Sequence, residues 1–417
     1  MNEVKTASQV VVIGAGYAGL LATVRLAGKL QRSRALRARP VKITLVNASD
    51  LFVERLRLHE FAANRVVKPR PLESYLKGTG VQFVQGYVSH LDADRHILKV
   101  ETKAGNHHIS YDKLLFALGS LTDRNSVSGV DQYAYTLTPV GPLSAVELRE
   151  QLPIFNAKGG RLVVCGGGAT GIEAAAEFAS NYPNLKVSLL TQGVFGEFLG
   201  KAVAVYMRKA LEDWGVTILD NTVVSQVKPN EVVCSTGTLG YDLCLWTGGF
   251  IAPPLAREAG LAVNERGQVL IDPFMRSVSH PDIFAVGDAA YPVEEPGAKV
   301  RMSAYTALIM GGHGADCLSA TLLGQTPRPF SFAYLGQGIA LGRHTAIGFG
   351  KSPDDHPHPP YFTGRVGYGI RSLFLPAFTA LPAIERRWPG FFFWTGKDRY
   401  AAKRRTEKPL PSRGNAS

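Results

Sequence analysis

The chain has 417 residues, which is enough for two or three domains with substantial cores. Hydrophobic residues make up 45% of it and charged residues 19%, as in an ordinary globular protein. The net charge of +12 favours acidic partners, nucleic acid or anionic lipid, but it says nothing about the fold. The four cysteines are widely spaced and form no C-x-x-C, which argues against a disulfide framework and a zinc ribbon.

The N-terminus, residues 1–9, is polar and leads directly into the first predicted strand, which leaves no room for a signal peptide. No apolar run reaches the roughly 18 residues of a membrane span. The nearest candidate, 372–384, is interrupted by Pro376 and Pro382. We therefore expect a cytoplasmic protein without an integral membrane segment.

The first predicted unit is a strand at 10–13, a glycine turn and a helix that begins at Tyr17. The turn carries Gly14, Gly16 and Gly19, the spacing of a dinucleotide-binding fingerprint. The first glycine allows the tight turn, the second lets backbone N–H groups approach a pyrophosphate, and the third lets helix and strand pack closely. The helix N-terminus adds partial positive charge. This pattern predicts a bound dinucleotide.

The next strand, 41–46, is followed by Asn47. Dinucleotide-binding folds usually place an acidic residue here, against the adenosine ribose hydroxyls. An asparagine can still donate and accept hydrogen bonds at this position, but without charge. The substitution weakens the fingerprint without removing it.

The same pattern recurs at 162–178, where Gly166, Gly168 and Gly171 lie between an apolar run and a segment of strong helix formers. Each glycine loop is followed by an apolar strand that begins Tyr-Asp and ends in glycine, at 111–119 and at 241–249. These parallels indicate an internal duplication of two mononucleotide-binding domains. The strand after the second loop ends at Thr191-Gln192, with no acidic residue and no nearby arginine, so NADH and NADPH both stay open.

A third segment, 282–290, is predicted to be a strand, a glycine, and Asp288 at the start of a helical stretch. An aspartate at a helix N-terminus is commonly a cap. The alternative is a cofactor ligand, and the residues alone do not choose between them.

No metal site is predicted. His356 and His358 flank a proline, which is typical of an exposed loop. His107 and His108 lie in a predicted hairpin. We therefore assign no metal ligand.

These motifs, in this order, resemble the two-dinucleotide-binding-domain flavoproteins, and more closely type II NADH dehydrogenases and apoptosis-inducing-factor-like NADH oxidoreductases. The resemblance extends over roughly residues 10–350 and implies an α/β fold with two Rossmann-like domains. An FAD-binding domain at 1–120 and 251–327 would be split by an NAD(P)H-binding domain at 121–250, with a C-terminal segment at 328–417. Hydride would pass from NADH or NADPH to FAD.

The resemblance also implies roles for individual residues. Glu173 matches a glutamate near the nicotinamide and flavin and is the candidate catalytic residue; an ordinary helix glutamate is the alternative. FAD is expected at Gly14, Gly16, Tyr17, Ala18, Gly19, Asn47, Val88, Ala117, Gly119, Asp288 and Tyr305. The nicotinamide nucleotide is expected at Gly166, Gly168, Ala169, Thr170, Gly171, Thr191 and Gly248.

Two departures from the resembled families concern the electron acceptor. The chain has no redox-active cysteine pair, so electrons should pass directly from reduced FAD to a small-molecule or protein acceptor. Type II NADH dehydrogenases carry A-Q-x-A-x-Q-x-G at the quinone face, and here Tyr305 and Ile309 replace the two glutamines. A quinone, an acidic electron-carrier protein, and a non-enzymatic role as a flavin-dependent interaction protein are the three hypotheses.

From Tyr361 onward, basic residues interleave with aromatic ones, including the run 391–394, and a basic tail follows. In type II dehydrogenases the C-terminal region lies on the membrane surface. Aromatic rings and cations together fit peripheral binding to an anionic membrane, here the inner face of the cell membrane. The alternative is that the aromatics cover the flavin domain or a homodimer interface. Nucleic acid is disfavoured as a partner because no recognised binding module is found.

Overall fold

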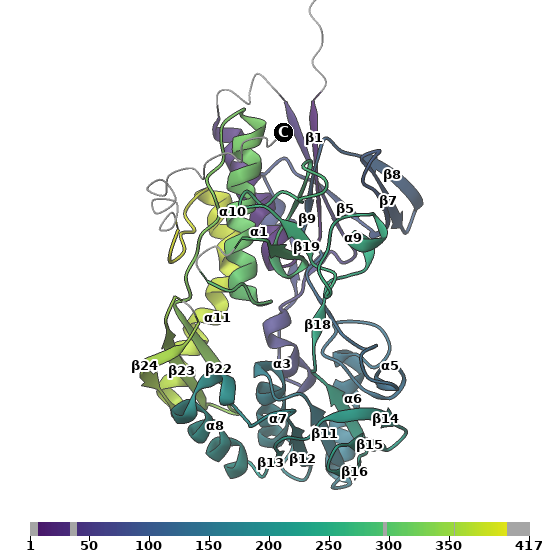
Figure 1. Ribbon diagram of the computed structural model, residues 1–417, viewed down its shortest axis with the longest axis vertical. Helices are drawn as coiled ribbons and strands as arrows, with labels where there is room; N and C mark the ends of the chain where they lie inside the picture. The colour runs from purple at the N-terminus through teal and green to yellow at the C-terminus, as the bar shows by residue number, and fades with distance from the viewer. Residues whose placement is uncertain (1–6, 34–39, 295–297, 354, 398–417) are drawn as a thin grey trace, which may run out of the picture.

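The computed structural model describes residues 7–33, 40–294, 298–353 and 355–397. It is an α/β structure with two larger parallel sheets, one in each half of the molecule, and smaller sheets around them, one of which lies at the side (Figure 1). The expected fold class is confirmed. The basic tail lies outside the described residues. No helix in the described ranges combines the length and the hydrophobicity needed to span a bilayer.

The first sheet has the strand order β20-β9-β1-β2-β5, and all its neighbours are parallel. Its strands are short and apolar, and the central ones are buried, as expected for a parallel sheet covered by helices. They are β1 (Ser8–Ile13), β2 (Val41–Asn47), β5 (Gln82–Gln85), β9 (Lys113–Phe116) and β20 (Ile283–Ala285). Strand β20 follows β9 in the sheet but not in the chain, because the strands of the second sheet come between them in the sequence.

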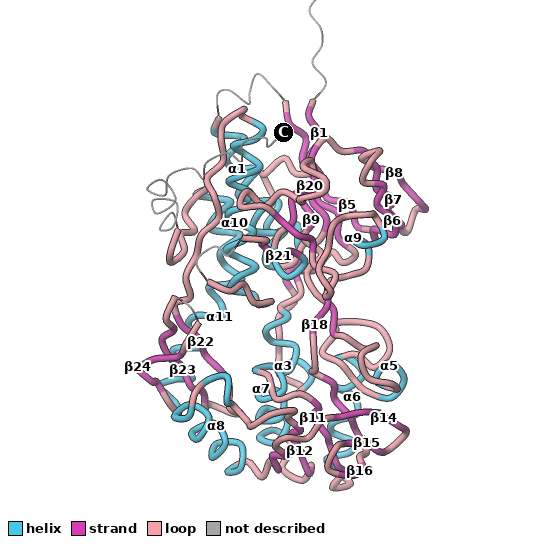
Figure 2. The backbone as a smooth tube through the Cα atoms, in the orientation of Figure 1, coloured by secondary structure: helices cyan, strands magenta, loops and turns pink. Residues whose placement is uncertain are grey.

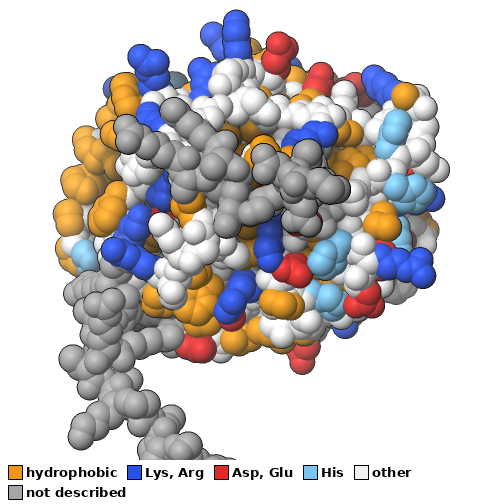
Figure 3. All heavy atoms as spheres, turned by 90° about the horizontal axis from the view of Figure 1, so that it is seen from above, with side chains coloured by type: hydrophobic (Ala, Val, Ile, Leu, Met, Phe, Trp, Pro, Cys, Tyr) orange, Lys and Arg blue, Asp and Glu red, His pale blue; other side chains and the backbone are white. Residues whose placement is uncertain are grey.

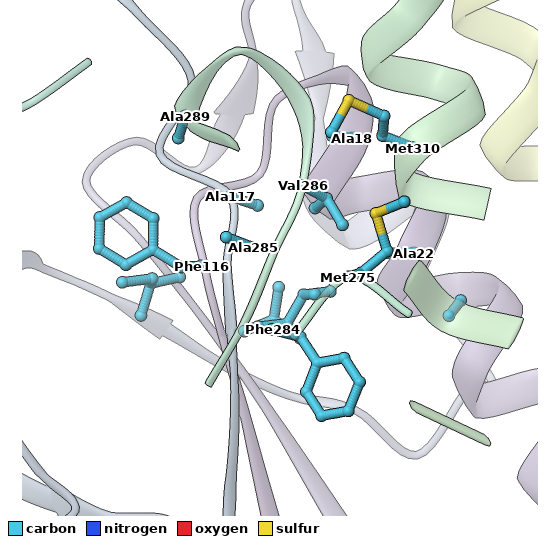
Figure 4. Close-up of a cluster of buried hydrophobic side chains, with 14 of the residues drawn as sticks. Ala18, Ala22, Phe116, Ala117, Met275, Phe284, Ala285, Val286, Ala289 and Met310 are labelled. Carbon is cyan, nitrogen blue, oxygen red and sulfur yellow. The ribbon is translucent and has the colours of Figure 1, made fainter. Parts of the chain in front are cut away.

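Two helices cover this sheet, α1 (Tyr17–Arg32) and α10 (Ala304–Leu322). They pack backbone to backbone, because a Cβ on Gly311 would collide with the carbonyl oxygen of Ala18. Figure 4 shows the apolar cluster beneath them, in which Met310 and Ala18 lie beside Val286 of the segment that follows β20. This packing fixes the first glycine loop against the strand ends.

The second sheet has the order β13-β12-β11-β17, again all parallel. Its strands are β11 (Arg161–Cys165), β12 (Lys186–Leu190), β13 (Thr217–Leu219) and β17 (Leu243–Trp246). Its helices are α6 (Ala145–Ala157), α7 (Ala169–Asn181) and α8 (Lys201–Asp213). The chain crosses between the halves at the paired strands β10 (Leu121–Thr122) and β18 (Phe250–Ile251), and β18 is visible there in Figure 2.

The C-terminal part forms the antiparallel sheet β22 (Gly336–Ala340), β23 (Ala346–Lys351) and β24 (Pro357–Phe362), followed by the long helix α11 (Gly364–Arg387). The loop expected around His358 is wrong, because this residue lies on β24. The prolines of β24 are tolerated because an edge strand needs fewer backbone donors. α11 continues through Pro376 and Pro382, the two prolines that interrupt the apolar run at 372–384.

Short elements complete the fold. They are β3 (Leu51–Phe52), η1 (Arg55–Arg57), α3 (Leu58–Ala62), β4 (Arg70–Pro71), α4 (Leu72–Leu76), β6 (Tyr87–Asp92), β7 (Ile97–Thr102), β8 (Gly105–Ser110), α5 (Val130–Tyr133), β14 (Val224–Lys228), β15 (Glu231–Cys234), β16 (Gly237–Gly240), η2 (Glu197–Leu199), α9 (Leu255–Glu258), β19 (Val269–Ile271), η3 (Gly287–Ala289) and β21 (Ala290–Pro292). His107 and His108 lie in the β7–β8 hairpin, as predicted. The helical stretch expected after Asp288 is wrong, because η3 is one turn and β21 follows it, paired with β19.

The C-terminal segment is anchored to the first half by a buried arginine. Arg25 of α1 donates two hydrogen bonds of 2.8 Å to the carboxylate of Asp316 on α10, and one of 2.9 Å to Glu385 on α11. Glu385 also accepts the backbone N–H of Gly390 at 2.7 Å. Because all these groups are paired, the charges are tolerated in a buried position. Helix α11 and the residues after it are thereby fixed to the two helices that cover the first sheet.

The aromatic run at 391–394 divides between core and surface. Trp394 is 3% exposed, and its indole N–H donates to the carbonyl of Ser331 at 2.9 Å. Phe392 packs against the same core. Phe391 and Phe393 point outward, and Phe393 is 71% exposed. Trp394 and Phe392 therefore cover the core, as one interpretation of the sequence expected, whereas membrane binding by the exposed Phe391 and Phe393 stays a prediction.

Candidate functional site: two dinucleotide loops

The first glycine loop connects β1 to α1 at the carboxyl edge of the first sheet. Gly14 has φ = +94°, and a Cβ there would collide with the carbonyl of Ala117 on the strand-end segment. A Cβ on Gly19 would collide with the carbonyl of Gly14. A Cβ on Gly16, in contrast, would meet no heavy atom within 4 Å. Two glycines are thus required by packing, and the middle one opens space over the helix N-terminus for a ligand.

The second loop, between β11 and α7, repeats this geometry. Gly166 has φ = +125°, and a Cβ there would lie 2.6 Å from Oγ1 of Thr247. A Cβ on Gly171 would collide with the carbonyl of Gly166, and one on Gly168 would meet nothing within 4 Å. Ala169 and Thr170 begin α7, whose N-terminus faces this space. Both loops therefore have the cradle that a pyrophosphate needs.

Asp288 is nearly buried beside the first loop and has an unsatisfied oxygen. Its Oδ2 accepts a hydrogen bond from Ser120 at 2.8 Å, while Oδ1 has no partner within the described part of the chain. Burial raises the pKa of this carboxyl, and the hydrogen bond from Ser120, the charge of Arg55 and the backbone N–H of Ser303 oppose the rise. A buried acceptor without a donor is costly, which indicates that a ligand hydroxyl completes it. FAD, with its ribityl hydroxyls and pyrophosphate, fits this set of groups.

Arg55 and Ser120 were not predicted from the sequence. Arg55 as a residue is exposed, but its guanidinium is directed at the site and donates to the backbone carbonyl of Ser120. Desolvation of the guanidinium lowers the pKa of Arg55, and the charge of Asp288 opposes this. Ser120 directly follows Gly119 at the strand end, so adjacency was a usable signal for it. Arg55 lies in an irregular segment with no motif, so nothing in the sequence marked it.

The other residues expected at FAD lie around the same sheet edge. The Asn47 side chain accepts the N–H of Ala15 at 2.9 Å and donates to the carbonyl of Ser49 at 2.7 Å, so it holds the glycine loop. Gly119 has φ = +70° after β9, and Tyr17 packs edge-on against a phenylalanine of β3. Val88 is buried on β6, a strand that contacts β2. Their contacts with FAD stay predictions.

Glu173 lies where three parts of the chain meet. Its Oε1 accepts the backbone N–H of Ala340 on β22 at 2.9 Å and pairs with Arg371 of α11 at 3.0 Å. Arg371 also approaches Glu60 of α3 at 3.4 Å. Burial lowers the pKa of Arg371, but the charges of Glu173 and Glu60 outweigh it, so the net shift is upward. Glu173 is therefore a fixed carboxylate rather than an ordinary surface glutamate, and its catalytic role stays a prediction.

Tyr305, which replaces the first glutamine of the quinone-face segment, begins α10. Its hydroxyl donates to the carbonyl of Ala333 at 3.2 Å, and its ring stacks on Tyr334 with centroids 6.1 Å apart. Burial raises the pKa of Tyr305. The phenol thus ties α10 to the segment before β22. Its predicted contact with FAD is untested.

At the second loop, Thr191 is buried directly behind Gly167. Gly248 follows Thr247 after β17, where a Cβ would lie 2.9 Å from the ring of Trp246. Both therefore lie at the carboxyl edge of the second sheet, where a nucleotide binds in such folds. Their contacts with the nicotinamide nucleotide stay predictions.

The cysteines offer no disulfide at the first loop. Cys165 and Cys244 have sulfurs 3.9 Å apart, but both are buried on strands of the second sheet. Contact with Cys244 and burial together raise the pKa of the Cys165 thiol, which makes it a poor nucleophile. Among the described residues, no group of three histidine, cysteine or acidic side chains is arranged to hold a metal.

Comparisons with known proteins agree with this geometry. Residues 8–311 match the pyridine nucleotide-disulphide oxidoreductase family. A NADH dehydrogenase-like protein of Mycobacterium tuberculosis is 30% identical over 302 residues, covering 68% of this chain and 73% of that protein. A type II NADH:quinone oxidoreductase of Staphylococcus haemolyticus is 26% identical, covering 82% of this chain and 89% of that protein.

A solved structure supports the fold. The Plasmodium falciparum NDH2 structure in complex with NADH superposes with a TM-score of 0.73 at 15% identity, covering 92% of this chain and 99% of that one. The matched region contains both glycine loops and Asp288. Since the family match extends over most of the chain, the protein belongs to the pyridine nucleotide-disulphide oxidoreductase family.

Proposed function

We propose that this protein oxidises NADH through a bound FAD and passes the electrons to a quinone at a membrane surface. The observation that carries the proposal is the pair of glycine loops with matched open cradles, one of them beside the unpaired oxygen of Asp288. Relatives named as type II NADH:quinone oxidoreductases and as a demethylphylloquinone reductase support the quinone. The enzyme is an FAD-dependent oxidoreductase that works without a redox disulfide.

The protein's own residues supply binding and positioning. When bound, FAD accepts a hydride from the nicotinamide and delivers electrons to the second substrate. Asp288, Ser120 and Arg55 hold its polar chain in a partly dry site. The carboxylate of Glu173 is held by Arg371 at the junction of the nucleotide helix α7 and the C-terminal helix α11. This fixed position beside the α7 N-terminus suits Glu173 to orient a substrate or move a proton at its Oε2.

The membrane part of the proposal rests on a set of outward apolar side chains, here called the C-terminal apolar face. α11 and the residues after it expose large apolar side chains to solvent. Arg371 and Glu385, on the other side of α11, fix the helix to the rest of the molecule. In the space-filling view, apolar side chains line the left edge, the side on which α11 lies in Figure 1 (Figure 3). The face consists of Val366, Leu373, Phe374, Trp388, Phe391 and Phe393.

Such a face is suited to the interfacial region of a bilayer. Aromatic rings settle at headgroup depth, and the neighbouring exposed Arg365 and Arg387 attract anionic lipid, at roughly 1 kcal/mol per charge at low salt. An exposed set of this kind on a monomer otherwise marks a protein interface. Homodimerisation through the same face is therefore the competing outcome of the test.

Binding to vesicles tests this directly. The wild type should co-sediment with anionic vesicles at about 0.05 M salt and less at about 0.5 M, because screening weakens the charged contacts. Replacing Leu373 and Phe374 by serine should reduce binding, whereas Val140→Ser, at a 76% exposed valine of the other half, should not. The membrane proposal would be contradicted if the wild type bound vesicles no better than the double variant. It would also be contradicted if the wild type were a dimer that dissociated in the double variant.

A soluble reductase of an acidic electron-carrier protein is the second candidate. The net charge of +12 favours it, because opposite charge steers association. The replacement of the family glutamines by Tyr305 and Ile309 also favours an acceptor other than quinone. Reduction of a carrier protein that falls steeply with salt, together with failure to reduce quinones, would select this candidate.

A further inference from the structure

The two halves place equivalent residues at the position that recognises an adenosine ribose. Gly14 N–H donates to the carbonyl of Val46, and Gly166 N–H donates to that of Leu190, both at 2.9 Å. Asn47 and Thr191 follow these carbonyls, so Thr191 is the counterpart of Asn47. In nucleotide-binding folds this position carries the acid that binds the ribose 2′-hydroxyl of NAD and excludes the 2′-phosphate of NADP. Thr191 has no charge and packs behind the glycine loop.

An acid from a later turn reaches the same loop. After Thr191 the chain runs through Gln192 and Gly193, reverses at Gly196 with φ = +71°, and starts η2 at Glu197. The Oε2 of Glu197 lies 3.7 Å from the position of a Cβ on Gly193, two residues beyond Thr191. Glu197 is exposed and forms no ion pair or side-chain hydrogen bond within the described ranges. Its carboxylate is therefore available at the carboxyl edge of β12.

The cations nearby do not form an equivalent site for a phosphate. Arg208 of α8 is ion-paired with Asp220 at 2.6 Å. Lys201 lines the same surface depression as Glu197, a cavity of about 320 Å³ between this loop and α8. Lys201 is exposed and is the first residue of α8, separated from η2 by Gly200. Among the described residues, no hydrogen bond or ion pair joins its amine to this loop. Asp220 also contacts this loop, because its Oδ1 accepts the backbone N–H of Phe195 at 2.6 Å, but its charge is paired with Arg208. Within the described residues, Glu197 is therefore the carboxylate without an ion pair beside Gly193.

We infer that Glu197 selects NADH over NADPH, taking the role that Thr191 cannot. This inference rests on the proposed function, because it names the nucleotide that the second loop accepts. The carboxylate would accept hydrogen bonds from the ribose hydroxyls of NADH and would repel the 2′-phosphate of NADPH.

The test measures only the nucleotide half-reaction. FAD-loaded protein is mixed without oxygen with NADH or NADPH, and the rate of flavin bleaching gives the apparent Kd for each. The wild type should prefer NADH. Glu197→Gln should change the ratio of the apparent Kd values for NADH and NADPH by about tenfold in favour of NADPH, which is the effect expected from losing one charged hydrogen bond. Glu197→Lys should shift it further. Glu150→Gln, at an exposed glutamate of α6, is the matched control and should leave the ratio unchanged.

Other results would overturn the inference. A wild type that prefers NADPH would do so, and so would Glu197 variants that keep the wild-type ratio with full FAD content and unchanged Tm. A loss of NADPH use in Lys201→Met, with no change in Glu197→Gln, would assign selection to Lys201 instead. If neither NADH nor NADPH bleached the wild-type flavin, the proposed function itself would be contradicted, so the two failures are distinguishable.

Discussion

Substitution by alanine should affect two neighbouring aromatics differently: at Trp394 it should lower the stability of the fold, and at Phe393 it should weaken membrane binding. Trp394→Ala removes an indole that is 3% exposed, contacts the ring of His313 edge-on and donates to the Ser331 carbonyl. Truncating a buried tryptophan costs about 3–5 kcal/mol. At roughly 2–4 °C per kcal/mol, the Tm should fall by about 10 °C. Phe393→Ala removes a ring that is 71% exposed, and the stability should change by less than about 0.5 kcal/mol.

Vesicle binding should show the reverse order. Phe393→Ala removes one apolar group from the C-terminal apolar face and should weaken binding to anionic vesicles at unchanged Tm. Trp394→Ala, measured well below its Tm, should bind vesicles nearly as well as the wild type. Thermal unfolding and co-sedimentation on the same samples check both. Equal destabilisation by the two variants, or vesicle binding that depends on Trp394 alone, would refute the division of this run between core and surface.

Further predictions concern the loops and the buried charges. Gly16→Val should fold but lose FAD, and Gly168→Val should keep FAD but resist bleaching by NADH, because each side chain fills an open cradle; absorbance spectra check both. Burial raises the pKa of Asp316, but Arg25 and its neighbours outweigh it, so the pKa is lowered. The pair's contribution is therefore complete above about pH 4 and lost as pH falls further. Asp316→Asn should cost about 3 kcal/mol at pH 7 and flatten the Tm profile below about pH 4. Arg371→Met should lower kcat with little change in the KM for NADH, as steady-state kinetics will show; Arg371→Lys should restore part of it.

The sequence was most informative where local geometry alone dictates the residue. Gly14 and Gly166 need positive φ and close packing, so their spacing predicted both nucleotide loops and the duplicated domain. Helix α11 was not predicted; Pro376 and Pro382 oppose a helix locally, while tertiary packing of its anchored side overrides that preference. The turn after Asp288 was misjudged for a related reason, since pairing with β19 draws the next residues into a strand.

Contacts between distant segments could not be predicted. Arg25 carries no motif, yet it is buried against Asp316 and Glu385, which lie 291 and 360 residues away. Arg371 belonged to a region read as a cationic surface, yet its guanidinium faces inward to Glu173. Composition gives the charges of such residues, but only the fold determines which of them are brought together.

The central claim is that NADH bound at the second glycine loop reduces FAD bound at the first, and that the reduced FAD then passes its electrons to a quinone. Anaerobic stopped-flow absorbance tests it in one experiment: NADH is mixed with the FAD-loaded protein, and a quinone is added after the flavin has been reduced. We expect rapid bleaching of the flavin by NADH, followed by full recovery of its absorbance on quinone addition, in a variant lacking all four cysteines as well as in the wild type. A flavin that NADH does not bleach, or one whose bleaching requires the cysteines, would contradict the account.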